Sequence, residues 1–460
     1  MKIIRIITKI IRIIGHWLYN RIWIPFIKNI DFQLLITLTI TAIGGYIAIK
    51  IPDIVEYFRC KRKPYITFES NYTQVFHLSK EVPSLEYSIG GESWKELKTQ
   101  RIVFGGDCGK LLLRGRSTTG TNGATVSFGT DAEVVCTGNI CTIVDYKNYK
   151  NTTASNAKFI ELFNNCKQLT VPPELPIKIL ADSCYFGMFK NCTMLKIPPE
   201  LPADSLNNNC YSYMFMGCTS IKEAPELPAI ELADSCYYSM FENCSSLIKA
   251  PSLNAENLTN SCYSRMFKGC SSLVNAPKLP AKNLAARCYS YMFSDCTSIT
   301  IEPDLPATKM TEECYLRMFN NCTSLYVTSC LPAMELAKGC YNCMFVGCTS
   351  LVTAPVLPAV ELAPSCYRNM FHYCSSLSSI TVAAIDFTKE QNPWWWLSRT
   401  SKKGICFKIK QAKWDEILIP SGWTIKTIEP EQIISKIAKQ QIQQMVDHKM
   451  KNDSVYYPDH

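Results

Sequence analysis

Two series of cysteines recur through the middle of the chain at a constant interval of 26 residues. The first series is Cys184, Cys210, Cys236, Cys262, Cys288, Cys314, Cys340 and Cys366. The second follows eight residues later, at Cys192, Cys218, Cys244, Cys270, Cys296, Cys322, Cys348 and Cys374, with Cys166 one interval before it. A period without insertions means that every unit repeats one geometric step, which is typical of a solenoid. The spacing therefore predicts eight full units and one partial unit.

Each unit predicts one helix and one short strand. Apolar residues at 206, 210, 211, 214, 215 and 218 fall on one helical stripe. The residue before the second cysteine is usually Asn, Asp or Gly, as at Asn191 and Gly217. These residues tolerate the left-handed backbone of a helix C-cap. Leu195 and its equivalents then open an extended segment that prolines such as Pro199 close. We expect an α/β solenoid, with stacked parallel strands as one wall and helices as the other.

The repeat cysteines are predicted to be buried free thiols. They recur at core-facing positions beside Leu, Met and Phe, where a thiol packs as a small hydrophobic group. Disulfides are the alternative for a secreted protein. Outside the repeats, Cys136 and Cys141 could close a hairpin, and the sequence does not decide whether they do.

The first 63 residues predict attachment to a membrane. Lys2, Arg5, Lys9 and Arg12 fall on one face of a helix whose other face is isoleucine, a pattern that favours anionic lipid. Residues 32–49 carry no charge and could cross most of a bilayer as a transmembrane helix. The bilayer is thus an expected partner of residues 1–52, and a buried core helix with a charged arm is the alternative.

The remainder of the chain divides into four predicted parts. Residues 64–150 contain short alternating runs and a Gly90-Gly91 turn, which predict a small β-sandwich-like domain. Residues 151–378 are the repeats, 379–428 a C-terminal cap, and 429–460 a tail with helical spacing at Ile434 and Ile437. Tryptophans crowd the cap at positions 394–396, 414 and 423. We expect them to cover the end of the repeat core, with stacking on sugars as the alternative.

Nothing in the sequence predicts catalysis, a cofactor, a metal or nucleic-acid binding. The formal net charge is +9, but residues 1–30 hold six cations and no acid, so the excess is largely terminal. The five histidines are widely separated, and no nucleophile, base and acid group together. Near Lys110, the string GGDCGK lacks the first glycine and the hydroxyl residue of a phosphate loop. We therefore expect a protein that is not an enzyme.

A candidate ligand-binding column follows from the strand alternation. If Leu195 and its equivalents point inward, the next residue of each unit points outward. These residues, termed the strip below, are Lys196, Lys222, Ile248, Val274, Thr300, Tyr326 and Val352. The strip is cationic at one end and apolar at the other. Its alternative role is merely to cover a sheet, because half-buried sheets favour such residues.

The segment CYSYMFMGCTSIKEAPELPAIELADSCYYSMF, residues 210–241, resembles the BspA-like leucine-rich repeats of surface proteins from gut Bacteroidales and of phages that infect them. The resemblance covers about residues 158–378 and implies a right-handed leucine-rich-repeat solenoid used for recognition or adhesion, without catalytic residues. Together with the span predicted from residues 32–49, it suggests a membrane-anchored protein whose repeats face outward at the cell surface and bind a protein or a carbohydrate on another surface. The alternative is a phage virion protein, associated with the tail or a fibre, that contacts the bacterial host.

Overall fold

The computed structural model describes residues 63–152, 155–328, 330–387, 396–414, 419–440 and 442. Contacts divide the chain into two compact units, Met1–Arg62 and Lys63–His460, and every described residue belongs to the second. The predicted basic helix, the predicted span at 32–49 and the expected lipid contact of residues 1–52 therefore lie outside the described residues.

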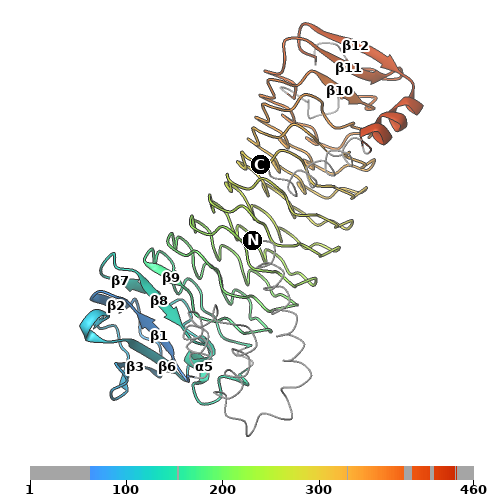
Figure 1. Cartoon of the computed structure of the whole chain (residues 1–460). Helices are drawn as coiled ribbons and strands as arrows, with labels where there is room; N and C mark the ends of the chain where they lie inside the picture. Colours follow the sequence, from blue (N-terminus) through green and yellow to red (C-terminus); the bar gives the residue numbers. More distant parts are fainter. Residues whose placement is uncertain are drawn as a thin grey trace, which may run out of the picture. The chain divides into compact units, whose positions relative to one another are not determined.

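Residues 66–137 form short strands in two sheets (Figure 1). The strands are β1 (Ile66–Glu69), β2 (Gln74–Leu78), β3 (Leu85–Ile89), β4 (Lys95–Glu96), β5 (Ile102–Phe104), β6 (Leu111–Gly115), β7 (Val126–Phe128) and β8 (Val134–Thr137). One sheet has the order β4-β3-β6-β1-β8-β9, where β9 is Leu169–Val171, and the other has the order β5-β2-β7. Phe68 of β1 lies 5.5 Å from Phe76 of β2 and 6.1 Å from Phe128 of β7, measured between ring centroids, so the two sheets share a core. Alternating runs at 65–68, 85–89, 102–104, 111–114, 125–128 and 134–136 predict six of these strands, whereas no such run predicts β2 or β4.

The larger sheet continues directly into the first repeat. Strand β8 pairs in parallel with β9 (Leu169–Val171), and Gly120 bridges Lys158 in the same sense. Two short helical segments, η1 (Gly106–Cys108) and α5 (Cys141–Asp145), interrupt the strands, and α5 buries Cys141, Ile143 and Val144. The β-rich module and the repeats thus form one continuous core.

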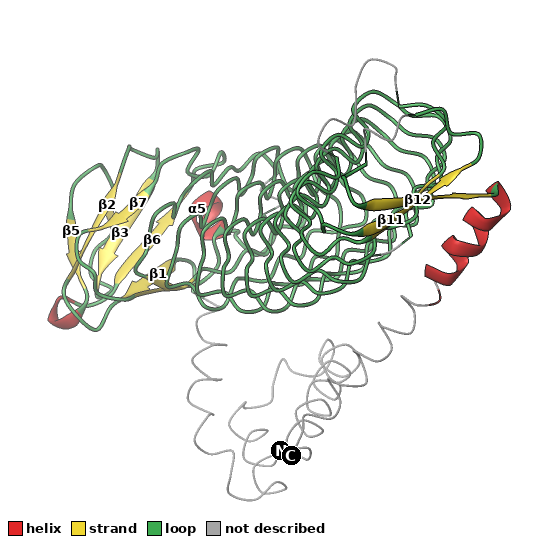
Figure 2. Cartoon of the chain, turned by 90° about the horizontal axis from the view of Figure 1, so that it is seen from above, coloured by secondary structure: helices red, strands yellow, loops and turns green. Residues whose placement is uncertain are grey.

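The predicted α/β solenoid is wrong. Among the described residues between 155 and 387 the structure contains no helix, and its regular elements are strands in mixed sheets. Figure 2 shows the units drawn almost entirely as turns and loops. The expected parallel strands are reduced to isolated bridges, such as Glu223 with Lys249 and Ile301 with Val327. Prolines such as Pro225 follow these bridges closely and cannot donate a further ladder hydrogen bond.

Overlapping turns take the place of the predicted helices. In the unit at 181–192, the amides of even-numbered residues donate within the unit, as from Phe186 to the Ser183 carbonyl at 3.2 Å. Amides of odd-numbered residues donate to the next unit instead, as from Tyr185 to the Cys210 carbonyl at 2.9 Å. A helix cannot form here because every fourth residue has positive φ: 58° at Ser183, 57° at Gly187 and 59° at Asn191. The left-handed backbone expected before the second cysteine is present, but it belongs to a turn.

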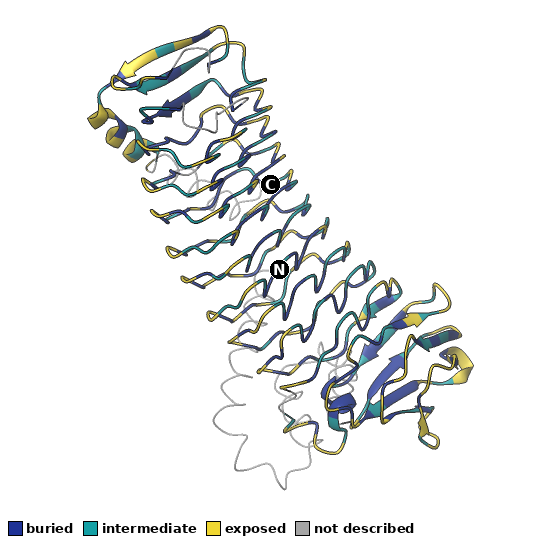
Figure 3. Ribbon diagram, turned by 180° about the vertical axis from the view of Figure 1, so that it is seen from behind, coloured by how far each residue is buried: buried dark blue, intermediate teal, exposed yellow. Residues whose placement is uncertain are grey.

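The turns direct two aromatic columns into the core. Tyr185 and its equivalents stack at 5.7–6.1 Å between ring centroids as far as Tyr367. Phe163 and its equivalents stack at 5.5–5.8 Å as far as Phe371. Both columns are buried, and Figure 3 shows the buried residues running through successive units. Offset stacking between equal rings supports the constant step from unit to unit.

The prediction of buried free thiols is confirmed for the described cysteines. Each of them is a free thiol, and all except Cys108 are buried, including Cys136 and Cys141. The second series has an additional role, because its thiols donate to the carbonyl of the preceding unit. Cys270 Sγ, for example, lies 3.1 Å from the Phe241 oxygen. These thiols therefore link the units as well as fill space.

A three-stranded parallel sheet follows the last repeat. It consists of β10 (Ser379–Val382), β11 (Gly404–Ile409) and β12 (Trp423–Ile428). Trp396, Trp414 and Trp423 are buried here, and the Trp414 indole donates to the Ala384 carbonyl at 2.9 Å. These three side chains pack in the core and are not exposed for stacking on sugars. Residues 394 and 395 lie outside the described residues.

A helix at 430–440 packs beside this sheet (Figure 2). Ile433 and Ile437 join Val356, Ile409 and Ile428 in a separate apolar cluster, whereas Ile434 is 71% exposed. A helical tail was predicted, but the packed face differs from the one expected because Ile434 points away from it.

The expected membrane-anchored location is corrected by the described part of the chain. No helix there is long and apolar enough to cross a bilayer. The helix at 430–440 rises about 16 Å at 1.5 Å per residue, against a hydrocarbon core of about 30 Å.

Candidate functional site

The strip lies on the surface where each turn segment ends. Lys196, Lys222 and four apolar or aromatic members are exposed, and Thr300 is half-buried. The exposed fractions of the four are 53% for Ile248, 41% for Val274, 51% for Tyr326 and 49% for Val352. Leu195 and its equivalents are buried, so the expected alternation of inward and outward side chains holds at these positions.

Backbone hydrogen bonds hold neighbouring strip residues in register. The Ile248 amide donates to the Lys222 carbonyl at 2.9 Å, and the Tyr326 amide donates to the Thr300 carbonyl at 3.1 Å. At the far end, the Ser378 amide donates to the Val352 carbonyl at 2.9 Å. Residues paired in this way on parallel chains lie about 4.8 Å apart. The structure therefore brings the strip residues together as one column.

The charged end of the strip is available to a ligand. Lys196 and Lys222 are exposed, and within the described residues neither forms an ion pair. The apolar end places several exposed hydrophobic side chains next to each other, whereas surface hydrophobic residues usually occur singly. Together they form a linear surface with a cationic part and an apolar part.

The turn segments carry a second surface that sequence reasoning missed. Phe186, Tyr213 and Tyr238 meet edge to face, with ring centroids 5.2 Å apart at both contacts. Farther along, the guanidinium of Arg265 lies 4.9 Å from the Tyr291 ring centroid, a cation–π distance. We call these five residues the aromatic–arginine column. Burial, with Tyr238 as a second cause, raises the pKa of Tyr213 to about 12, so its hydroxyl stays protonated at neutral pH.

The sequence held a weak signal for this column. Tyr213, Arg265 and Tyr291 occupy the same place in their units as Gly187, at the middle residue with positive φ. Aligning the units at the period of 26 brings these residues into one column. These side chains are half-buried, and the expected helix did not predict their contacts with one another.

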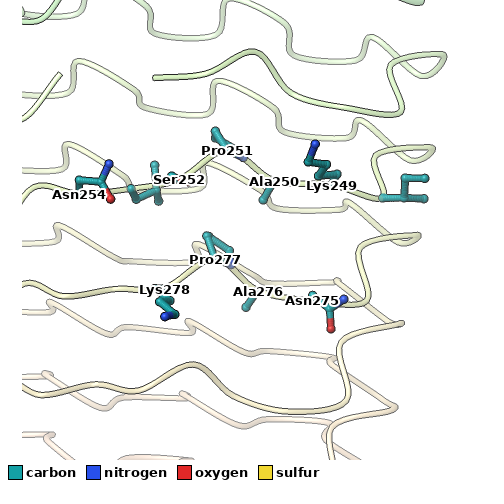
Figure 4. A pocket seen from close by; sticks show the side chains of 11 residues that line it. Lys249, Ala250, Pro251, Ser252, Asn254, Asn275, Ala276, Pro277 and Lys278 are labelled. Carbon is teal, nitrogen blue, oxygen red and sulfur yellow. The ribbon is translucent and has the colours of Figure 1, made fainter. Parts of the chain in front are cut away.

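A hollow of about 450 Å³ opens between two successive units. It is lined by residues 248–254 and 275–278 (Figure 4). Ala250 and Ala276 occupy the same position in the two units, with Lys249 and Lys278 nearby. Ile248 of the strip lies at its rim. A second hollow, of about 410 Å³, is lined by residues 360–363, 366–368 and 385–387.

The buried thiols have a chemistry unsuited to reaction. Desolvation by burial raises the pKa of Cys244, and likewise of Cys374, to about 12. A thiol is a nucleophile or a metal ligand only as a thiolate, which such a pKa suppresses at neutral pH. Among the described residues, no group of three His, Cys, Asp or Glu side chains is placed to hold a metal ion.

Neither the family models nor the curated proteins nor the solved structures include a match to this chain. The resemblance to BspA-like repeats therefore stays a prediction from residues 210–241.

Proposed function

We propose that this chain is a recognition protein, not an enzyme, that binds a protein or a glycan of another surface through the strip. The observation that carries the proposal is the strip itself: six exposed side chains and one half-buried one, in register over seven units. A rigid column of this kind suits an extended ligand. The backbone turns that hold it are tied to the core by two stacked aromatic columns, so little order is lost on binding.

The two ends of the strip favour different parts of such a ligand. Lys196 and Lys222 would attract carboxylate, sulfate or phosphate groups. Tyr326 presents a half-exposed ring that suits an apolar side chain or the face of a sugar. The family resemblance, with its adhesion proteins, points to the same class of function. The alternative of a phage virion protein rests on that resemblance alone.

A capture experiment with two matched variants tests the proposal. The immobilised chain is exposed to an array of bacterial surface glycans and surface proteins. The test variant combines Lys196→Glu, Lys222→Glu and Tyr326→Ala. The control variant makes the same kinds of change at other exposed residues, Lys178→Glu, Lys282→Glu and Tyr72→Ala.

We expect the test variant to lose capture and the control variant to keep it. Both should unfold within about 0.5 kcal/mol per site of the parent, as is usual for surface substitutions. Equal capture by the two variants would exclude the strip. Loss in both would indicate a general dependence on charge.

A further inference from the structure

The hollow has an occupied counterpart elsewhere in the same chain. Gln440, at the end of the helix 430–440, reaches the repeats with its amide side chain. Its Oε1 accepts from the Val356 amide at 3.0 Å. Its Nε2 donates to the Ala354 carbonyl and to Thr328 Oγ1, both at 3.5 Å. The helix thus docks through one amide and through the apolar face formed by Ile433 and Ile437.

The three residues that Gln440 contacts have equivalents three units earlier. Subtracting three periods of 26 residues converts Thr328, Ala354 and Val356 into positions 250, 276 and 278. These positions are Ala250, Ala276 and Lys278, and all three line the hollow. Figure 4 shows Ala250 on one unit above Ala276 on the next, with Lys278 two residues farther along. The hollow is therefore the Gln440 site repeated where the chain's own helix does not reach.

The hydrogen-bonding groups that Gln440 satisfies are open at the hollow. Within the described residues, neither the Ala276 carbonyl nor the Lys278 amide has a hydrogen-bond partner. A carboxamide offers one acceptor and two donor hydrogens, which suits a carbonyl and an amide separated by one residue. The same pairing is made at Ala354 and Val356.

The surroundings of the hollow differ from those of Gln440 in charge. Lys278 stands where the other site has Val356, and it forms no ion pair among the described residues. Lys249, also in the lining, is paired with Glu223 at 3.4 Å. The exposed Ile248 supplies apolar surface at the rim. A ligand for this site would add a carboxylate to the amide and the apolar face.

We propose that the hollow is a docking site for an amphipathic helix of a partner protein. The helix presents a glutamine side chain to Ala276 and Lys278, an apolar residue to Ile248 and an acidic residue to the Lys278 ammonium group. The site shares Ile248 with the strip, but Ala276 and Lys278 lie outside the strip, and the residues changed in the strip variant do not line the hollow, so each proposal can fail without the other.

The test uses the full chain and a fluorescein-labelled peptide with the sequence of residues 428–442 in which Lys436→Glu and Lys439→Glu place carboxylates within one helical turn of Gln440 and Ile433 is kept. Fluorescence anisotropy measures its binding. We expect saturable binding, and at least a tenfold loss for a peptide with Gln440→Ala. In the protein, Ala276→Phe fills the hollow and should abolish binding, whereas Ala224→Phe, at the same position of another unit, should not.

Two further measurements test the contact with Lys278. Lys278→Glu is an exposed change with no demand on folding, and it should weaken binding more than Lys282→Glu does. Hydrogen exchange at the Lys278 amide should slow when the peptide is added. Absent saturable binding, or binding that survives both Ala276→Phe and Lys278→Glu, would overturn the proposal. The strip variant should bind the peptide normally, which separates the two sites.

Discussion

Removing the sulfur of Cys270 tests whether the second cysteine series links the units. Cys270 is fully buried, and its thiol donates to the Phe241 carbonyl at 3.1 Å. That carbonyl also accepts from the Cys244 amide at 3.1 Å, so it keeps one partner when the thiol is lost. Cys262 of the first series is equally buried, but its thiol makes no such bond to the preceding unit. Cys262→Ala is therefore the matched control for Cys270→Ala.

The two substitutions differ by one weak hydrogen bond. Each loses the burial of one sulfur, worth about 1 kcal/mol by analogy with a methylene. The small cavity adds about 0.5 kcal/mol. Loss of the thiol–carbonyl bond should add about 0.5–1 kcal/mol for Cys270 alone. We expect a destabilisation of about 2 kcal/mol for Cys270→Ala and of about 1.5 kcal/mol for Cys262→Ala.

Urea unfolding of the full chain, in a reducing buffer and followed by circular dichroism, measures the difference. Cys270→Val serves as a second variant, because it fills most of the space without a donor. If Cys262→Ala proves as costly as Cys270→Ala, and Cys270→Val is as stable as the parent, then the thiols act only as space-filling groups and the reasoning is refuted.

Three other predictions concern thiol chemistry and the turns. The ordinary thiol pKa of 9.0 rises to about 12 for Cys210, Cys244, Cys262, Cys366 and Cys374, because burial disfavours the thiolate. Since the folded state then holds protons that the unfolded state releases, stability should be fully present below pH 9 and fall steeply between pH 9 and 12; an unchanged urea midpoint at pH 10.5 would contradict this. Iodoacetamide at pH 8 should modify Cys108 rapidly in the native chain and the repeat cysteines only after denaturation. Intra-unit disulfides found by mass spectrometry would contradict the burial of free thiols in the repeats. Gly269→Ala should lower the free energy of unfolding by about 1–2 kcal/mol, because φ is +74° at this residue and the new Cβ would lie within 3 Å of Asn243 Oδ1. Asn243→Gly should be nearly neutral. Equal urea midpoints for the two variants would argue against the left-handed turn.

The repeat period could be derived from the cysteines, but the local structure inside a unit could not. Buried residues at 184, 185, 188, 189 and 192 have a period of four. Over so few residues that period differs from 3.6 by less than the width of an apolar helical stripe, so turns and helix fit equally well. Asn191 carried a signal for left-handed backbone. The equivalent middle position carried none, because it holds residues such as Tyr213 and Arg265 that rarely adopt positive φ.

Of the candidate sites, the strip could be predicted from the sequence and the hollow could not. The exposure of Ile248 and Tyr326 follows from alternation after a buried Leu or Ile, which requires no knowledge of the turns. The hollow depends on backbone groups of neighbouring units that have no hydrogen-bond partner within the described residues. It is identified as a docking site only through the contact of Gln440 with Val356, 84 residues away in the sequence. No local pattern encodes a contact of that range.

Photo-crosslinking from the strip shows directly whether a captured ligand lies on it. A benzophenone amino acid replaces Tyr326, which is 51% exposed, and in a second protein it replaces the half-buried Tyr238 of the aromatic–arginine column. Both proteins are loaded with a surface component that the parent chain captures, and are then irradiated. We expect a covalent adduct from position 326 and none from position 238. An adduct from position 238 alone, or none at position 326 while the component stays bound, would contradict it.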